Sequence, residues 1–263
     1  QKTSRKEKNE DYIIANDIEK IYHKSGKKFQ ALSKINFEIK KGETLALIGE
    51  SGSGKTSLGR ILVRLIQANS GILKVGNESY NLENKKVRKD FRKKVQIIFQ
   101  DPYAALNPKI RVGDCIAEVF EQLENLSKKE AKLTSEKLLN QVGLSLEFYQ
   151  RYPHQLSGGQ RQRVCIARAL ACKPELLICD ESVAALDVSV QSQILNLLRK
   201  IQNELNVTYL FITHDLGVVK FLSDRIILLK SGKIEEINDK ENFFHNPISD
   251  YGKSLLKIYK EAN

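Results

Sequence analysis

The sequence predicts an α/β fold with a mainly parallel sheet, an N-terminal antiparallel β subdomain and an inserted helical subdomain. Three observations lead to this prediction. Thr44–Ile48 and Leu176–Cys179 are short, continuous apolar runs of the kind that form buried parallel strands. Ile35–Ile39 alternates apolar and polar residues, as a half-exposed strand does. From Val112 to about Gln141, apolar residues recur at helical spacing, with charged residues opposite.

Length and composition are those of a large globular chain. Its 263 residues, 41% of them hydrophobic, can bury the core of one large α/β domain or of a core with a smaller subdomain. No apolar run approaches the roughly 18 to 20 residues that span a bilayer, and the polar start is unlike a signal peptide. We therefore expect a soluble, cytosolic chain. Four cysteines without C-x-x-C spacing are expected to be small buried side chains in a reducing compartment: Cys115, Cys165, Cys172 and Cys179.

The net charge is +11, from 43 Lys and Arg against 32 Asp and Glu. Such an excess raises the question of a nucleic acid or an anionic membrane as partner. Part of the excess lies near the N-terminus and part in Lys85–Lys94, and neither segment carries an array of aromatic residues for base stacking. We favour a solvated basic face as the interpretation.

Residues Gly49 to Thr56, GESGSGKT, fit the phosphate-loop pattern G-x-x-x-x-G-K-[S/T]. They lie between the apolar run Thr44–Ile48 and the helical pattern of Leu58–Ile66, which is the order of strand, loop and helix in a P-loop NTPase core. Glycines let backbone NH groups surround the β- and γ-phosphates, and the helix N-terminus favours the anion. Lys55 would add a positive charge, and Thr56 a hydroxyl ligand for Mg²⁺. A glycine-rich turn that binds nothing is the alternative. The predicted nucleotide contacts are Gly49, Glu50, Ser51, Gly52, Ser53, Gly54, Lys55, Thr56 and the adjacent Ser57.

The segments around this loop suggest a small antiparallel sheet at the start of the chain. Residues 1–11 are predicted to be a mobile basic tail, and Tyr12–Ala15 to begin the first strand. Lys41-Gly42 would form the turn that leads from Ile35–Ile39 into the strand before the phosphate loop. Ile72–Val75, between two turn signals, predicts one more short strand.

The apolar run Val95–Phe99 predicts a strand that stops at Gln100-Asp101-Pro102, where proline ends the ladder. Gln100 therefore lies where a strand meets a loop, and by itself it would be assigned no role. The helical pattern that follows predicts an inserted helical subdomain over about residues 101–165.

Within that stretch, Ser157-Gly158-Gly159-Gln160 precedes a run of apolar residues at helical spacing. A serine followed by paired glycines is typical of a helix N-terminus. A helix start with free NH groups and a hydroxyl is a second potential anion site, although an ordinary cap would have the same sequence.

The buried run Leu176–Cys179 ends in two carboxylates, Asp180 and Glu181. Ligands of parallel sheets gather at the carboxyl ends of strands. Asp180 is placed to hold Mg²⁺ through water, and Glu181 to polarise an attacking water. Capping of the next helix, predicted over Val190–Leu205, is the alternative for this pair.

A further strand, Val207–Thr213, is rich in β-branched and aromatic residues and ends at His214. His214 could contact a γ-phosphate, or it could be a satisfied residue at a sheet edge. Ile226–Leu229 and Ile234–Ile237, separated by Ser231-Gly232, predict a hairpin.

Together, the phosphate loop, LSGGQ at Leu156–Gln160, LLICDE at Leu176–Glu181 and THD at Thr213–Asp215 resemble the ATP-binding subunit of ABC transporters. This resemblance implies that two ATP molecules lie between the phosphate loop of one subunit and the LSGGQ of the other. The implied nucleotide contacts of that second motif are Ser157, Gly158, Gly159 and Gln160, and Asp187 is implied as a further nucleotide contact. The roles implied for single residues are adenine stacking for Tyr22, γ-phosphate sensing for Gln100, a switch histidine for His214 and a place in the dimer interface for Asp187. The implied catalytic residues are thus Glu181, His214 and Gln100, and the implied metal contacts are Thr56, Gln100 and Asp180.

Narrower features are similar to the import ATPases for oligopeptides, dipeptides and nickel: QDPYAALNP at Gln100–Pro108, ALDVSVQ at Ala185–Gln191 and the ending FHNPISDYGKSLL at Phe244–Leu256. Two departures are Ser182, where many relatives have proline, and the end at Asn263 without a cysteine cluster. The resemblance divides the chain into an ATPase domain over residues 12–238 and a short C-terminal extension over residues 239–263.

The function expected from the resemblance is ATP hydrolysis coupled to uptake of peptides through a membrane permease. The cofactors would be ATP and Mg²⁺. The partners would be a second ABC ATPase subunit, in a heterodimer or alternatively a homodimer, the permease, and indirectly an extracytoplasmic solute-binding protein. The chain would lie at the cytoplasmic face of the cell membrane. Alternatives are an importer ATPase for nickel or another small solute, a nucleic-acid- or ribosome-associated ABC protein, and an ATP-binding scaffold without turnover; no nucleic-acid partner is expected.

Overall fold

The computed structural model describes residues 11–24 and 26–262. They divide into two compact units, one of residues up to Val87 and from Leu205 onward, the other of Arg88–Glu204. Most of the predicted tail, residues 1–10, lies outside the described residues, and Asp11 already begins the first strand.

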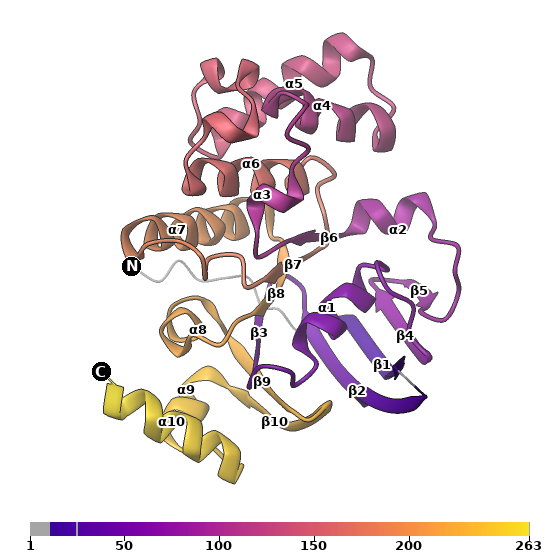
Figure 1. Ribbon diagram of the computed structural model, residues 1–263, viewed down its shortest axis with the longest axis vertical. Coiled ribbons are helices and arrows are strands. Elements are labelled where there is room, and N and C mark those ends of the chain that lie inside the picture. Colours follow the sequence, from indigo (N-terminus) through magenta and orange to yellow (C-terminus); the bar gives the residue numbers. More distant parts are fainter. Residues whose placement is uncertain (1–10, 25, 263) are drawn as a thin grey trace. The chain divides into compact units, whose positions relative to one another are not determined.

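The first unit holds the predicted antiparallel sheet, in the order β2-β1-β4-β5 (Figure 1). Strand β1 (Asp11–Lys24) pairs antiparallel with β2 (Lys27–Lys40) and with β4 (Ser70–Val75), which pairs with β5 (Glu78–Asn81). Strand β1 is much longer than its sequence pattern indicates. Register shifts follow Ala15, and Asp17 adopts a φ of 48°, so the regular alternation is lost although the strand continues.

The same unit contains strands in the order β10-β9-β3-β8. Strand β3 (Thr44–Ile48) is parallel to both of its neighbours, β8 (Thr208–Ile212) and β9 (Arg225–Lys230), and every residue of β3 and β8 is buried. Strand β10 (Lys233–Asp239) pairs antiparallel with β9 and confirms the predicted hairpin. Helices α1 (Lys55–Leu62) and α8 (Leu216–Leu222) follow β3 and β8. The predicted mainly parallel α/β core is confirmed.

The C-terminal segment forms two helices, α9 (Lys240–His245) and α10 (Asp250–Ala262). Phe243 of α9 and Tyr251 of α10 are buried with Ile48 of β3, Val219 of α8 and Leu228 of β9 in one hydrophobic cluster. These two helices therefore complete the core of the first unit.

Glu236 on β10 fastens the turn between α9 and α10. Its carboxylate accepts hydrogen bonds from the backbone N–H of Ile248 (2.9 Å), from the backbone N–H (2.9 Å) and hydroxyl (2.7 Å) of Ser249, and from the Asn238 amide (3.1 Å). Burial raises the pKa of this carboxyl, but the hydrogen bonds outweigh burial and the net pKa is lowered. The ionised form of Glu236 thus stabilises the folded chain.

We predict that Glu236→Gln lowers the free energy of unfolding at pH 7 by about 1.5 to 3 kcal/mol, because hydrogen bonds to a charged group are lost. A carboxyl with a lowered pKa contributes stability above its unfolded pKa and loses it as the pH falls through the folded pKa. The difference between variant and wild type should therefore shrink below about pH 4. Urea unfolding across pH 3 to 8 measures this difference in the free energy of unfolding. Glu235→Gln, a substitution at the exposed neighbouring residue, is the matched control. A deficit that is constant with pH would show that the charge of Glu236 is irrelevant.

The second unit combines two parallel strands with a set of helices. Strand β6 (Val95–Ile98) pairs with β7 (Leu176–Asp180). The long helical pattern is split into α4 (Val112–Leu123) and α5 (Lys128–Gln141), which pack against each other and against α6 (Gly158–Leu170). The split has a local cause, since Ser127 caps α5 in a capping box with Glu130. The other helices of this unit are α2 (Lys89–Lys94), α3 (Pro102–Ala105), η1 (Leu146–Gln150), η2 (Pro153–Gln155) and α7 (Val188–Leu205).

All four cysteines are buried, as predicted. Burial raises the pKa of Cys165 and of Cys179 to about 12, so both thiols stay protonated at neutral pH. Across the described part of the chain, no helix combines the length and apolar character that crossing a bilayer requires.

Candidate functional site

The phosphate loop leaves the carboxyl end of β3 and enters α1 at Lys55. Gly54 is the N-cap, with a φ of 109°, and a Cβ built there would lie 2.7 Å from the Ala31 carbonyl oxygen. A Cβ on Gly49 would meet the Leu229 carbonyl oxygen at 2.1 Å. Only glycine fits at these two positions, because side chains would collide with the backbone that surrounds the loop. The two glycines of the loop thus have a packing reason in this chain.

Backbone hydrogen bonds, one from a neighbouring hairpin and one within the loop, hold the phosphate loop in place. The Ser53 carbonyl accepts a hydrogen bond from the N–H of Gly232 (2.9 Å), and the Ser53 N–H donates to the Glu50 carbonyl (3.1 Å). Gly232 lies in the turn of the β9–β10 hairpin. The hairpin therefore fixes the conformation of the loop.

Lys55 lies inside the bend of the loop and is only 6% exposed. Its ammonium group donates to the carbonyl oxygens of Gly49 (2.7 Å) and Glu50 (2.8 Å). A buried cation at a helix N-terminus, held by carbonyl groups at short range, is suited to receive phosphate oxygens. The glycine loop, the helix N-terminus and the lysine together fit the phosphate groups of a nucleoside triphosphate.

The first unit brings two more predicted residues to this loop. The Tyr22 hydroxyl lies 3.3 Å from the Ser57 hydroxyl at the start of α1, and Tyr22 is 36% exposed. Leu47 and Ile212 are paired in the parallel ladder of β3 and β8, so His214 follows a strand end beside the phosphate loop. His214 is exposed. The first unit therefore places Tyr22 and His214 near the phosphate loop.

A residue that the sequence analysis missed also touches the loop. The Glu50 backbone N–H donates to the hydroxyl of Tyr251 on α10 at 2.9 Å, across 201 positions of sequence. Burial raises the pKa of Tyr251, so the hydroxyl stays protonated. The aromatic and aliphatic spacing of Tyr251, Leu255, Leu256 and Tyr259 is a helical pattern that could have predicted α10. No sequence signal connects it to Glu50.

In the second unit, Gln100, Asp180 and Glu181 lie at the ends of the paired strands β6 and β7. Ile98 and Cys179 are paired in the parallel ladder, so both strands end at the same edge. Asp180 is 5% exposed and Glu181 is half-buried. Glu181 has a φ of 47°, in the left-handed region that a glutamate rarely adopts. Such backbone conformations cluster at active sites.

The predicted helix start at Ser157 is confirmed. The Ser157 hydroxyl accepts from the Gln160 N–H (3.3 Å), and the Gln160 amide oxygen accepts from the Ser157 N–H (2.9 Å), so the two residues form a capping box. A Cβ on Gly159 would lie 2.4 Å from a methyl group of Val190, which places this helix start beside the first turn of α7. Asp187 is exposed and accepts from the Val190 N–H (3.0 Å). That hydrogen bond lowers the pKa of Asp187.

A family model described as ABC transporter matches residues 32–184. The oligopeptide transport ATP-binding protein OppF of Bacillus subtilis (strain 168) is 47% identical over 230 residues, which are 86% of this chain and 75% of that protein. OppF of Streptococcus pyogenes serotype M1 is 46% identical over 250 residues, 94% of this chain and 81% of that protein. A dimeric post-hydrolysis structure of the ATP-binding cassette MJ0796 with ADP and Pi is 30% identical, with a TM-score of 0.75 over 87% of this chain and 98% of that chain.

The chain belongs to the ABC transporter family.

As an ABC transporter ATPase, the chain binds and hydrolyses ATP, and the expectation of an ATPase is confirmed. The phosphate loop, with Lys55 in its bend, is the part of the ABC cassette that fits the triphosphate best. The individual roles of Tyr22, Gln100, Glu181 and His214 remain predictions.

The donor set for a metal ion in this ABC cassette is small. Among the described residues, no group of three or more His, Cys, Asp and Glu side chains could hold a metal ion. Mg²⁺ in nucleotide sites uses one or two protein ligands, and water and phosphate oxygens supply the rest. Thr56 in the first unit offers a hydroxyl and Asp180 in the second unit a carboxylate, and both are oxygen donors of the kind that Mg²⁺ prefers.

Proposed function

We propose that the chain is the ATP-hydrolysing subunit of an importer that takes up oligopeptides or dipeptides through a membrane permease. The observation that carries this proposal is the 46 to 47% identity, over most of the chain, with relatives named oligopeptide transport ATP-binding proteins. The phosphate loop supports the energetic part of the proposal, because it has the shape and charge that a triphosphate requires.

In the first unit, Lys55 would bind the β- and γ-phosphates, Tyr22 would stack on adenine, and His214 would contact the γ-phosphate. In support, Tyr22 lies within reach of the loop through Ser57, and His214 follows a strand that is paired with β3. Thr56 would bind Mg²⁺, which neutralises charge on the phosphates as the terminal bond breaks.

In the second unit, Asp180 would hold the magnesium ion through water and Gln100 would sense the γ-phosphate. Glu181 would accept a proton from the attacking water, because a carboxylate at a strand end is a suitable general base. Ser157 to Gln160 would bind the γ-phosphate held by a partner subunit, and Asp187 would contribute to the interface with that subunit.

The partners that we propose are a second ABC ATPase, the permease and indirectly an extracytoplasmic solute-binding protein. A heterodimer of two different ATPases is the proposed assembly, with a homodimer as its alternative. The chain would bind the permease at the cytoplasmic face of the membrane.

Reconstitution tests this proposal directly. The chain, its companion ATPase and the permease are placed in proteoliposomes with the solute-binding protein, and phosphate release is measured with peptides, with Ni²⁺ and with RNA. Of these three additions, we expect only peptides to stimulate phosphate release. If only Ni²⁺ stimulated phosphate release, nickel and not a peptide would be the cargo. If RNA stimulated phosphate release without the permease, the proposal of an importer would be rejected.

Two matched capping serines separate a phosphate contact from a structural cap. Ser127 and Ser157 each form a capping box, with Glu130 and Gln160 respectively. Ser127→Ala and Ser157→Ala should each lower the free energy of unfolding by about 0.5 to 2 kcal/mol. Only Ser157→Ala should also slow ATP turnover, by about tenfold or more, since a hydrogen bond to a phosphate would be lost. Equal turnover in the two variants would make Ser157 a cap and nothing more.

A further inference from the structure

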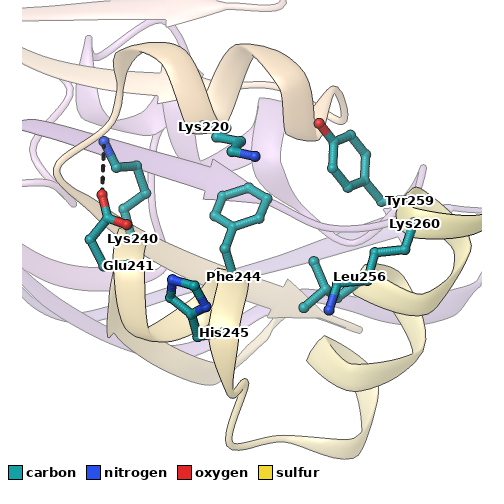
Figure 2. A pocket seen from close by; sticks show the side chains of 8 residues that line it. All are labelled: Lys220, Lys240, Glu241, Phe244, His245, Leu256, Tyr259 and Lys260. Carbon is teal, nitrogen blue, oxygen red and sulfur yellow. Dashed lines mark ion pairs between the residues drawn. The ribbon is translucent and has the colours of Figure 1, made fainter. Parts of the chain in front are cut away.

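Helices α8, α9 and α10 line a pocket of about 510 Å³ that opens to the surface of the first unit (Figure 2). Its apolar part is formed by Phe244 and Tyr259, which are half-buried, and by Leu256, which is buried. The rings of Phe244 and Tyr259 meet edge to face, with centroids 6.1 Å apart. The predicted nucleotide contacts are all absent from the lining of this pocket.

The rim of the pocket is basic. It consists of Lys220, Lys240, Lys260 and His245, against the single carboxylate Glu241. Glu241 lies 3.7 Å from Lys240, so that pair is locally neutral. Within residues 11–24 and 26–262, no carboxylate lies within salt-bridge distance of Lys220 or Lys260. The remaining charge at the rim is therefore positive.

Lys220 lies over the face of Phe244, with its ammonium nitrogen 5.9 Å from the ring centroid (Figure 2). Such an arrangement places a cation directly above an apolar surface. In a ligand with an acidic group and an apolar body, the acidic group would contact the lysines and the apolar body would contact the rings. Neither an uncharged apolar molecule nor a bare inorganic anion would use both parts.

We propose that this pocket binds a small organic anion that carries an aromatic or branched apolar group. The volume agrees with this size class, because pockets for small molecules measure about 300 to 1,000 Å³. Charge complementarity selects an anion, and the Phe244 and Tyr259 rings select its apolar body. Since α10 also carries Tyr251, which bonds to Glu50, the pocket is built on the helix that touches the phosphate loop.

The test uses the aromatic sulfonate 8-anilinonaphthalene-1-sulfonate as the probe, with the purified full chain and saturating Mg²⁺-ADP. We expect one saturable site by fluorescence titration. The double variant Lys220→Gln/Lys260→Gln should raise the Kd of the probe at least fivefold. The control Lys253→Gln/Lys257→Gln, which removes two exposed lysines of α10 that pair with Asp250 and Glu261, should leave the Kd within twofold.

A second variant tests the apolar part. Phe244→Leu, verified by circular dichroism and thermal melting to be folded, should also raise the Kd at least fivefold. No saturable binding, or equal Kd values in pocket and control variants, would overturn the proposal. So would an affinity for phosphatidylglycerol vesicles that depends on Lys220 and Lys260 while the free probe does not bind, since the basic rim would then serve a membrane surface. None of these outcomes depends on ATP turnover, so the test is separate from that of the proposed function.

Discussion

The Glu181→Gln variant of the assembled transporter is expected to turn over ATP about 10²- to 10⁴-fold more slowly than the wild type while it still binds ATP. Glutamine keeps the shape of the side chain but cannot accept a proton from water. The phosphate loop, which would carry most of the nucleotide affinity, is unchanged by the substitution. Phosphate release and equilibrium binding of a fluorescent ATP analogue measure the two effects separately.

The control for this variant is Glu175→Gln, which removes a carboxylate just before the other end of β7. Glu175 makes a partly exposed ion pair with Lys94 at 3.5 Å, and it lies at the end of β7 opposite to Glu181. Its turnover should stay near that of the wild type. Wild-type turnover in Glu181→Gln would reject Glu181 as the general base, and loss of ATP binding in that variant would show that its effect is not confined to catalysis.

Lys55→Ala should weaken ATP binding by about 1.5 to 3 kcal/mol, the contribution of hydrogen bonds to a charged group. That range corresponds to roughly 10- to 150-fold in Kd. The ammonium group is buried in the bend of the loop and bonds to two carbonyl groups there, so the substitution removes a positive charge from the loop itself. Isothermal titration with Mg²⁺-ATP measures the change.

Lys233→Ala serves as the control, because Lys233 is an exposed lysine on β10. Thermal melting of both variants separates lost affinity from lost folding. If Lys55→Ala remained folded and bound ATP as tightly as Lys233→Ala, the loop would not be the phosphate site.

Local sequence patterns predicted the features that depend on local physics. The order of strand, glycine loop and helix around Lys55 follows from apolar periodicity and from the backbone freedom of glycine. The capping box at Ser157 was predicted in part, since a serine before two glycines is a strong N-cap signal, and its Gln160 partner is three residues on. Buried strands such as β7 could be predicted because a strand that is covered on both faces is a continuous apolar run.

Features set by contacts between distant segments were not predicted. The bond between Tyr251 and Glu50 joins residues 201 positions apart, and Glu236 bonds to a turn beyond the next helix. The length of β1 was missed because its bulges interrupt the alternation on which strand prediction depends. The left-handed backbone of Glu181 could not be predicted either. Glycine and asparagine are enriched in this conformation and can indicate it in a sequence, whereas glutamate is not.

The most direct test of the central claim is a single-turnover experiment with ATP labelled at the γ-phosphate. The chain is assembled with its companion ATPase and the permease, Mg²⁺ is added, and bound nucleotide and free phosphate are followed together. Labelled ATP should be retained by the wild-type complex and then converted to ADP and phosphate. Retention with slower conversion is expected when this chain carries Glu181→Gln. If the wild-type complex neither retained the label nor released it as phosphate, the chain would not be an ATP-hydrolysing subunit.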